Sequence, residues 1–147
     1  MIITLFQKLP NDIIYEIKQF IIFKPRCKTE LMNAIYIYND NIQLSNQMYG
    51  YIELWDTSLI TDMSHIFYKL QKFNGDISRW NTSNVTDMES MFCCAINFNQ
   101  SLSKWDTSNV ITFQNMFGRA TTFNQPIDMW NTNKAINMSF MFYGAIN

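Results

Sequence analysis

Residues 73–97 read FNGDISRWNTSNVTDMESMFCCAIN, and closely similar copies follow without a gap at residues 98–122 and 123–147. A weaker copy precedes them at residues 48–72, so that four copies of 25 residues follow one another. A copy this short cannot bury its apolar side alone, but stacked copies can bury theirs against one another. The sequence therefore predicts a repeat protein in which like positions lie over like positions.

Two aromatic columns run unchanged through all four copies. Apolar columns that do not vary between repeats usually face the neighbouring copies, so we predict that they form the structural core, with each indole N–H bonded to an adjacent coil. The alternative is that the tryptophans form an exposed aromatic ledge that stacks on carbohydrate, bases or peptide. The predicted core residues are Trp55, Trp80, Trp105, Trp130, Phe67, Phe92, Phe117 and Phe142.

Each copy divides into an extended stretch, a turn and an amphipathic stretch. Residues 73–80 place Phe73 and Ile77 on one face of a short strand. Residues 81–84, Asn-Thr-Ser-Asn, favour a turn because their side chains bond to their own backbone. The apolar residues of 85–95 follow the spacing of one helix face. We therefore predict an α/β repeat solenoid of the leucine-rich-repeat type, with a short strand, a turn and a short helix in each coil.

The motif W-[ND]-T-S-N-V followed by M-F recurs across residues 48–147, and it resembles the BspA-like leucine-rich repeat. The first and last copies depart from it, with Leu59 and Lys134 in place of the Asn of the middle copies. Such repeats occur in bacterial surface proteins and lipoproteins and in proteins of protists and large DNA viruses. The resemblance implies a binding scaffold without catalysis.

Residues 1–47 do not repeat and are predicted to form a small α-helical N-terminal module. Residues 9–21, LPNDIIYEIKQFI, have the spacing of an amphipathic helix, and Thr29 is placed to cap a second helix. The same stretch resembles the opening of an F-box, although the usual second half has no counterpart. That resemblance implies docking on a Skp-type adaptor of a ubiquitin ligase, while the repeats select the substrate. The matching residues are Leu9, Pro10, Asp12, Ile13, Ile14, Ile17, Phe20 and Ile21.

The alternative for residues 9–21 is a helix that only covers the open end of the first repeat, and the two roles are compatible. Specificity for a protein partner is expected at positions that vary between copies and flank the predicted strand. These candidate partner-binding residues are Asp76, Arg79, Gln100, Lys104, Gln125 and Asp128.

No combination of residues predicts an enzyme, a metal site or a cofactor. The 11 basic and 12 acidic residues nearly balance, which argues against nucleic acid as a partner. His65 is the only histidine, and the adjacent Cys93 and Cys94 lack the spacing of metal ligands. Asp62 and Asp87 begin a carboxylate column that the later copies do not continue, so we interpret both as solvated surface residues.

Localisation is predicted from the cysteines and from the apolar runs. An odd number of cysteines favours reduced thiols and a cytoplasmic location, in the host cell if the chain is viral. No apolar run near the N-terminus has the length of a membrane span. The alternative is an extracellular surface protein with glycans on Asn84 and Asn99.

Taken together, these features predict a non-enzymatic protein–protein interaction scaffold, with a surface or adhesion repeat protein as the alternative. The copy that ends at Asn147 is not followed by a polar capping repeat. We therefore expect that end to self-associate or to meet a partner, unless the chain continues in a longer protein.

Overall fold

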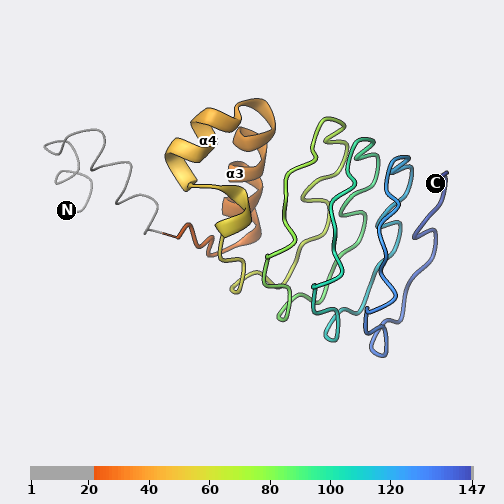
Figure 1. The fold of residues 1–147 in the computed structure, drawn as a ribbon. Helices are drawn as coiled ribbons and strands as arrows, with labels where there is room; N and C mark the ends of the chain where they lie inside the picture. Colours follow the sequence, from red (N-terminus) through yellow and green to blue (C-terminus); the bar gives the residue numbers. More distant parts are fainter. Residues whose placement is uncertain (1–21, 147) are drawn as a thin grey trace, which may run out of the picture.

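The computed structural model describes residues 22–146, which form two helices followed by a stack of coils. The helices are α3, Lys28–Asp40, and α4, Ile42–Tyr49, and a single 3-10 turn, η1, covers Ile52–Leu54. Figure 1 shows the helices at one end of the stack and the C-terminal coil at the other. We name the coils after the four sequence copies: coil 1 (48–72), coil 2 (73–97), coil 3 (98–122) and coil 4 (123–146).

Helix α3 closes the first end of the stack. Its buried residues are Leu31, Ala34 and Ile35, which join one continuous core with the coils. The helix begins one residue before Thr29, and its N-cap is Cys27, which makes no side-chain cap bond. Thr29 is therefore not the cap that the sequence predicts.

Helix α4 begins where the Asn41 side chain accepts a hydrogen bond from the Leu44 N–H, at 2.9 Å. It ends at Gly50, whose φ of 72° suits a residue without a Cβ. The sequence does not predict this helix, which runs through residue 48, the expected start of the first copy.

The prediction of an α/β repeat solenoid is wrong. After α4 ends at Tyr49, residues 50–146 contain no strand and no α-helix. Neighbouring coils are joined instead by isolated parallel bridges, one per interface, which link Asp62, Asp87, Thr112 and Asn137 in turn.

Consecutive turns replace the predicted short helices. Seven non-glycine residues of the coils have positive φ, which a right-handed helix excludes. In coils 1 to 4 they occur at two positions spaced four residues apart, and Gly144 completes the set with a φ of 70°. Two successive four-residue turns direct apolar side chains inward at nearly the spacing of a helix, which explains the misleading pattern. The seven residues are His65, Lys69, Ser90, Cys94, Asn115, Arg119 and Phe140.

In the turn segment of each coil, which in coil 2 covers residues 88–94, the backbone N–H groups alternate between two kinds of acceptor. In coil 2, the N–H groups of Met88, Ser90, Phe92 and Cys94 donate to carbonyls of coil 3. The N–H groups between them, such as that of Met91, close turns by bonding three residues back. The same pattern joins coil 1 to coil 2 and coil 3 to coil 4. The coils therefore stack by regular hydrogen bonds without forming a sheet.

Stacked phenylalanine rings fill the centre of the coils. The Phe92 ring lies 5.1 Å from that of Phe67 and 5.5 Å from that of Phe117, and the planes are within 5° of parallel. A second column, Phe73, Phe98 and Phe123, packs beside the first. The repeat period thus places each ring over the same ring of the next coil.

Candidate interaction surface

We call the six predicted partner-binding residues the lateral face, and the structure separates them into two groups. Asp76, Arg79, Lys104 and Asp128 are exposed. Gln100 and Gln125 are only partly exposed, and their amides are used within the stack. The exposed charged residues are therefore the part of the lateral face that is available to a partner.

A ladder of amide side chains holds this face in register. The Oδ1 atom of Asn74 accepts bonds from the Asn99 N–H and from the Gln100 side chain, at 3.0 and 3.1 Å. The Asn99 side chain does the same for the Asn124 N–H and for Gln125, at 2.9 and 3.0 Å. These bonds fix the corner that leads into the lateral face in coils 2 to 4.

The exposed charges of the lateral face influence one another across coils. The Ser78 N–H and hydroxyl, followed by the positive charges of Arg79 and Lys104, hold the pKa of Asp76 below its usual value. Arg79 belongs to coil 2 and Lys104 to coil 3, so the stack brings both cations near one carboxylate. The face therefore presents mixed charge at a spacing set by the coils.

A small open pocket of about 190 Å³ adjoins this face at the end of the stack that α3 covers. Its lining includes Tyr38, Asn39, Lys72 and Gly75. A Cβ atom at Gly75 would lie only 3.0 Å from Cε1 of Tyr38, so a larger residue here would need the Tyr38 side chain to move by a few tenths of an ångström.

The tryptophans lie in the interior rather than on a ledge. All four indole rings are buried, and the Nε1–H groups of Trp80, Trp105 and Trp130 each donate to a carbonyl of the preceding coil, at 2.9 to 3.1 Å. Trp55 donates to the Gly50 carbonyl. Phe67, Phe92 and Phe117 are fully buried, whereas Phe142, in coil 4, is 47% exposed.

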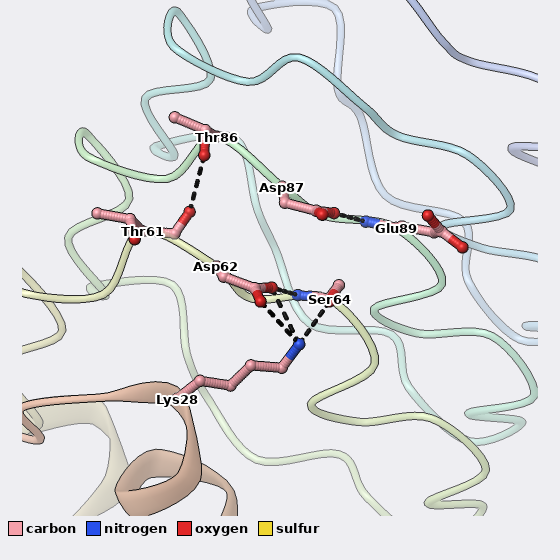
Figure 2. A network of polar contacts seen from close by, with 7 residues as sticks. All are labelled: Lys28, Thr61, Asp62, Ser64, Thr86, Asp87 and Glu89. Atoms are coloured by element: carbon pink, nitrogen blue, oxygen red, sulfur yellow. Dashed lines mark hydrogen bonds and ion pairs between the residues drawn. The ribbon is translucent and has the colours of Figure 1, made fainter.

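The acidic column is occupied by a lysine from α3 (Figure 2). The Lys28 Nζ bonds both carboxylate oxygens of Asp62, at 3.0 and 3.1 Å, and the Ser64 hydroxyl. Burial raises the pKa of Asp62, but hydrogen bonds from Ser64 and Lys28 outweigh it and leave that pKa below its usual value. Asp87 instead accepts a bond from the Glu89 N–H, at 2.8 Å. These carboxylates have structural partners, and the described part of the chain holds no group of three metal-ligating side chains.

The cysteine pair and the histidine do not form a catalytic arrangement with each other. The Sγ atoms of Cys93 and Cys94 lie 3.8 Å apart, and the Asn115 amide donates to Cys93 at 3.2 Å. Burial, followed by the neighbouring Cys94, raises the pKa of the Cys93 thiol, which opposes thiolate formation. His65 is exposed and packs edge-on against Tyr68.

The residues that resemble an F-box all lie outside the described residues. They are Leu9, Pro10, Asp12, Ile13, Ile14, Ile17, Phe20 and Ile21.

The structure also shows contacts that sequence reasoning missed. Lys24 forms an ion pair with Asp56 at 2.7 Å, and Lys28 forms one with Asp62, so that two cations next to the helices meet two carboxylates of coil 1. No local signal marks these two pairs, because the same columns carry Asp106 and Asp87 in coils 3 and 2 without an ion pair among residues 22–146.

These observations define a protein of stacked 25-residue coils closed at one end by helices. The chain belongs to the family described as "Mycoplasma protein of unknown function, DUF285", whose model matches residues 32–147. None of the curated proteins compared matches the chain, and no solved structure matches it either. Among the described residues, no helix has the length and apolar character needed to cross a membrane.

Proposed function

We propose that the chain is a non-enzymatic protein–protein interaction scaffold of the BspA-like repeat type, and that the exposed part of its lateral face contacts the partner. The observation that carries this proposal is the row of exposed charges, Asp76, Arg79, Lys104 and Asp128, presented by three successive coils. The positions that do not vary between copies are taken up by the core, while these exposed positions vary.

The rigidity of the face supports a binding role. Bonds from Gln100 and Gln125 to Asn74 and Asn99 hold the coil corners before any partner arrives. A pre-ordered surface loses little conformational freedom on binding, so more of the contact energy appears as affinity. Mixed charges at fixed spacing favour a partner of complementary charge pattern, chiefly through specificity and association rate.

The test compares the proteins retained from a cell extract by the unchanged chain and by a charge-reversed chain. The variant carries Asp76→Lys, Arg79→Glu, Lys104→Glu and Asp128→Lys, which leave the net charge unchanged and touch no core residue. We expect specific proteins to be retained by the unchanged chain and lost with the variant. A control with Lys69→Glu and Glu89→Lys reverses two charges in the turn segments of coils 1 and 2, outside the lateral face and at unchanged net charge, and should retain them. Identical retention by all three chains would refute the proposal.

Two further roles remain predictions from the sequence. Recruitment of substrates to a ubiquitin ligase depends on residues 9–21, and binding of a Skp-type adaptor that survives Pro10→Ala with Ile14→Asp would exclude it. The adhesion alternative predicts surface exposure and glycans on Asn84 and Asn99 instead of a cytoplasmic location. Asn84 is exposed, and its side chain donates to the Ser58 carbonyl of coil 1 at 2.8 Å, so a glycan there would disturb that bond.

A further inference from the structure

Two adjacent thiols occupy one turn of coil 2. Cys93 and Cys94 are the only neighbouring cysteines of the chain, and the third cysteine, Cys27, lies at the start of α3. Because the other coils form the same turn without a thiol, the fold does not require cysteine in these two columns. The equivalent residues of the other coils are Tyr68 and Lys69, Gly118 and Arg119, and Tyr143 and Gly144.

The turn holds the two sulfur atoms close together. Adjacent side chains of an extended strand point to opposite faces, but Cys94 lies in a turn and has a φ of 61°. The two Sγ atoms lie 3.8 Å apart. Neighbouring coils hold the backbone here, because the Lys69 N–H donates to the Cys93 carbonyl at 2.9 Å and the Cys94 N–H donates to the Gly118 carbonyl at 2.8 Å. The stack therefore fixes the contact between the thiols.

The two thiols differ in their exposure. Cys94 is partly exposed, whereas Cys93 is only 7% exposed and accepts a hydrogen bond from the Asn115 amide at 3.2 Å. Burial and the neighbouring Cys94 raise the pKa of the Cys93 thiol, and the Asn115 amide and the positive charge of Arg119 partly offset this. A reagent from solvent therefore meets Cys94 first, with Cys93 directly behind it. This order suits an attacking thiol followed by a resolving thiol.

We propose that Cys93 and Cys94 form a modification site, at which a small disulfide such as oxidised glutathione converts the two thiols to an intramolecular disulfide. The site is separate from the lateral face and does not depend on the proposed function. Its ligand class is a low-molecular-weight disulfide, which accepts two electrons from the pair.

The reaction has two exchange steps. In the first step, the Cys94 thiolate attacks one sulfur of oxidised glutathione, the S–S bond of the reagent breaks, and one glutathione thiolate leaves. In the second step, the Cys93 thiolate attacks Cys94 Sγ, the bond between Cys94 and the attached glutathione breaks, and the second glutathione thiolate leaves. The two protons lost by the protein thiols pass through solvent to the two released thiolates. The second step is intramolecular, so the contact between the sulfur atoms offsets the small fraction of Cys93 thiolate.

Oxidation should loosen both interfaces of coil 2. A covalent bond brings the Sγ atoms closer than their present contact, so the turn has to shift between two coils that hold its backbone. We therefore expect faster hydrogen exchange at the Lys69 and Cys94 amides, which bond across these interfaces. Because the new bond acts against these contacts, excess reduced glutathione should restore the two thiols.

The test treats the reduced 147-residue chain with oxidised glutathione at about pH 8, where thiols begin to ionise. Mass spectrometry of a digest should show that the peptide with Cys93 and Cys94 has lost two hydrogens and carries no glutathione. The exposed Cys27, which has no adjacent cysteine, should keep a mixed disulfide and serves as the internal control. The proposal is overturned by a pair that stays reduced, a pair that keeps glutathione, a disulfide between two chains, or a disulfide that excess reduced glutathione does not open.

Matched variants in a Cys27→Ser chain assign the order of the two thiols. Cys93→Ser keeps the partly exposed thiol and should stop at a mixed disulfide on Cys94. Cys94→Ser leaves only the buried thiol and should react at least about tenfold more slowly. Serine fits the positive φ of residue 94, since Ser90 in the same coil has a φ of 52°. Equal reaction rates in the two variants would contradict the assigned order.

Discussion

The two ends of the stack are completed in different ways. At the first end, α3 and the segment before it cover coil 1, and the Asp56 N–H donates to the Phe23 carbonyl. Phe23 also packs edge-on against Trp55, with ring centroids 5.1 Å apart. At the other end, coil 4 keeps the backbone of the repeat, but Phe142 is 47% exposed and the Phe142 N–H has no acceptor among residues 22–146. Within residues 22–146, a helical module thus covers coil 1, while no described residue covers the outer side of coil 4.

The comparison shows how position alone changes the role of a residue. All four coils carry the same aromatic and threonine columns. A residue of such a column contributes to stability only where a neighbouring coil covers it. Substitutions at equivalent positions should therefore lower stability much in the middle of the stack, where the residues are buried, and little in coil 4, where they are exposed.

The largest contrast is expected in the central phenylalanine column. Phe92→Ala removes a buried ring that stacks on Phe67, Phe98 and Phe117, and should lower the free energy of unfolding by about 3–5 kcal/mol. Phe142→Ala removes a half-exposed ring of the same column and should cost about 1 kcal/mol. Urea unfolding followed by circular dichroism measures both. Equal losses in the free energy of unfolding would mean that the Phe142 ring is covered to the same extent as the Phe92 ring.

A smaller contrast is expected in the threonine column. The buried Thr82 hydroxyl donates to the Asp106 carbonyl of the next coil at 3.0 Å. Thr82→Val leaves that carbonyl without its donor at nearly constant side-chain shape, and should cost about 1–2 kcal/mol. Thr132, at the same position in coil 4, is exposed, so Thr132→Val should change stability by no more than about 0.5 kcal/mol. A comparable loss in both variants, measured by urea unfolding, would disprove the dependence on a following coil.

The residues with positive φ provide a stabilising test. Lys69 is exposed with a φ of 61°, and Lys69→Gly relieves this conformation, which should raise stability by up to about 1 kcal/mol after the added freedom of glycine in the unfolded chain. Lys69→Ala is the control, because it removes the contact with the Tyr68 ring but keeps the conformation.

The equivalent change at the open end has the opposite sign. Gly144→Ala should lower stability by about 1 kcal/mol, because its φ is 70° and the new Cβ would lie 3.2 Å from Cγ of Arg119. Thermal unfolding measures all three variants. If the Lys69→Gly variant were less stable than the Lys69→Ala variant, the interpretation of the turns would be contradicted.

The repeat period and the aromatic columns were predictable because both repeat every 25 residues in the sequence. The local structure was not, because two four-residue turns and a short helix direct apolar residues inward at similar spacings. Among the eight positions with positive φ in this segment, only His65, Asn115 and Gly144 are residue types that favour it. Lys69, Ser90, Cys94, Arg119 and Phe140 carry no such signal, so the sequence favoured helices that the structure lacks.

The candidate surfaces were predictable only in part, for a related reason. Variable positions correctly identify side chains near the surface, but the bonds of Gln100 to Asn74 and of Gln125 to Asn99 depend on the exact stacking register. The pairing of Lys24 with Asp56 and of Lys28 with Asp62 depends on how α3 docks, which no local pattern encodes.

The smallest effect concerns the response of the closed end to acid. Hydrogen bonds from Lys24 and Ser58 lower the pKa of Asp56 to about 2, and the pKa of Asp62 is also below its usual value. Both carboxylates therefore bind protons less readily when folded, so the stability that they contribute is present above about pH 4 and is lost as the pH falls towards 2. The ion pairs are partly exposed, which keeps the contribution modest.

Coil 4 has Asn131 and Asn137 at these positions, so acid should not act on the open end in this way. Replacement of Asp56 and Asp62 by Asn gives the closed end the same neutral residues. The variant should lose less free energy of unfolding between about pH 5 and pH 2.5 than the unchanged chain does, because the two carboxylates no longer titrate. Hydrogen exchange at the Asp56 amide, which bonds to Phe23, should accelerate in acid in the unchanged chain, while exchange at the Phe117 amide, which bonds to Met141, should respond less. Parallel pH profiles for the two chains would show that docking of α3 does not depend on these carboxylates, and that the closed end is held by its apolar contacts alone.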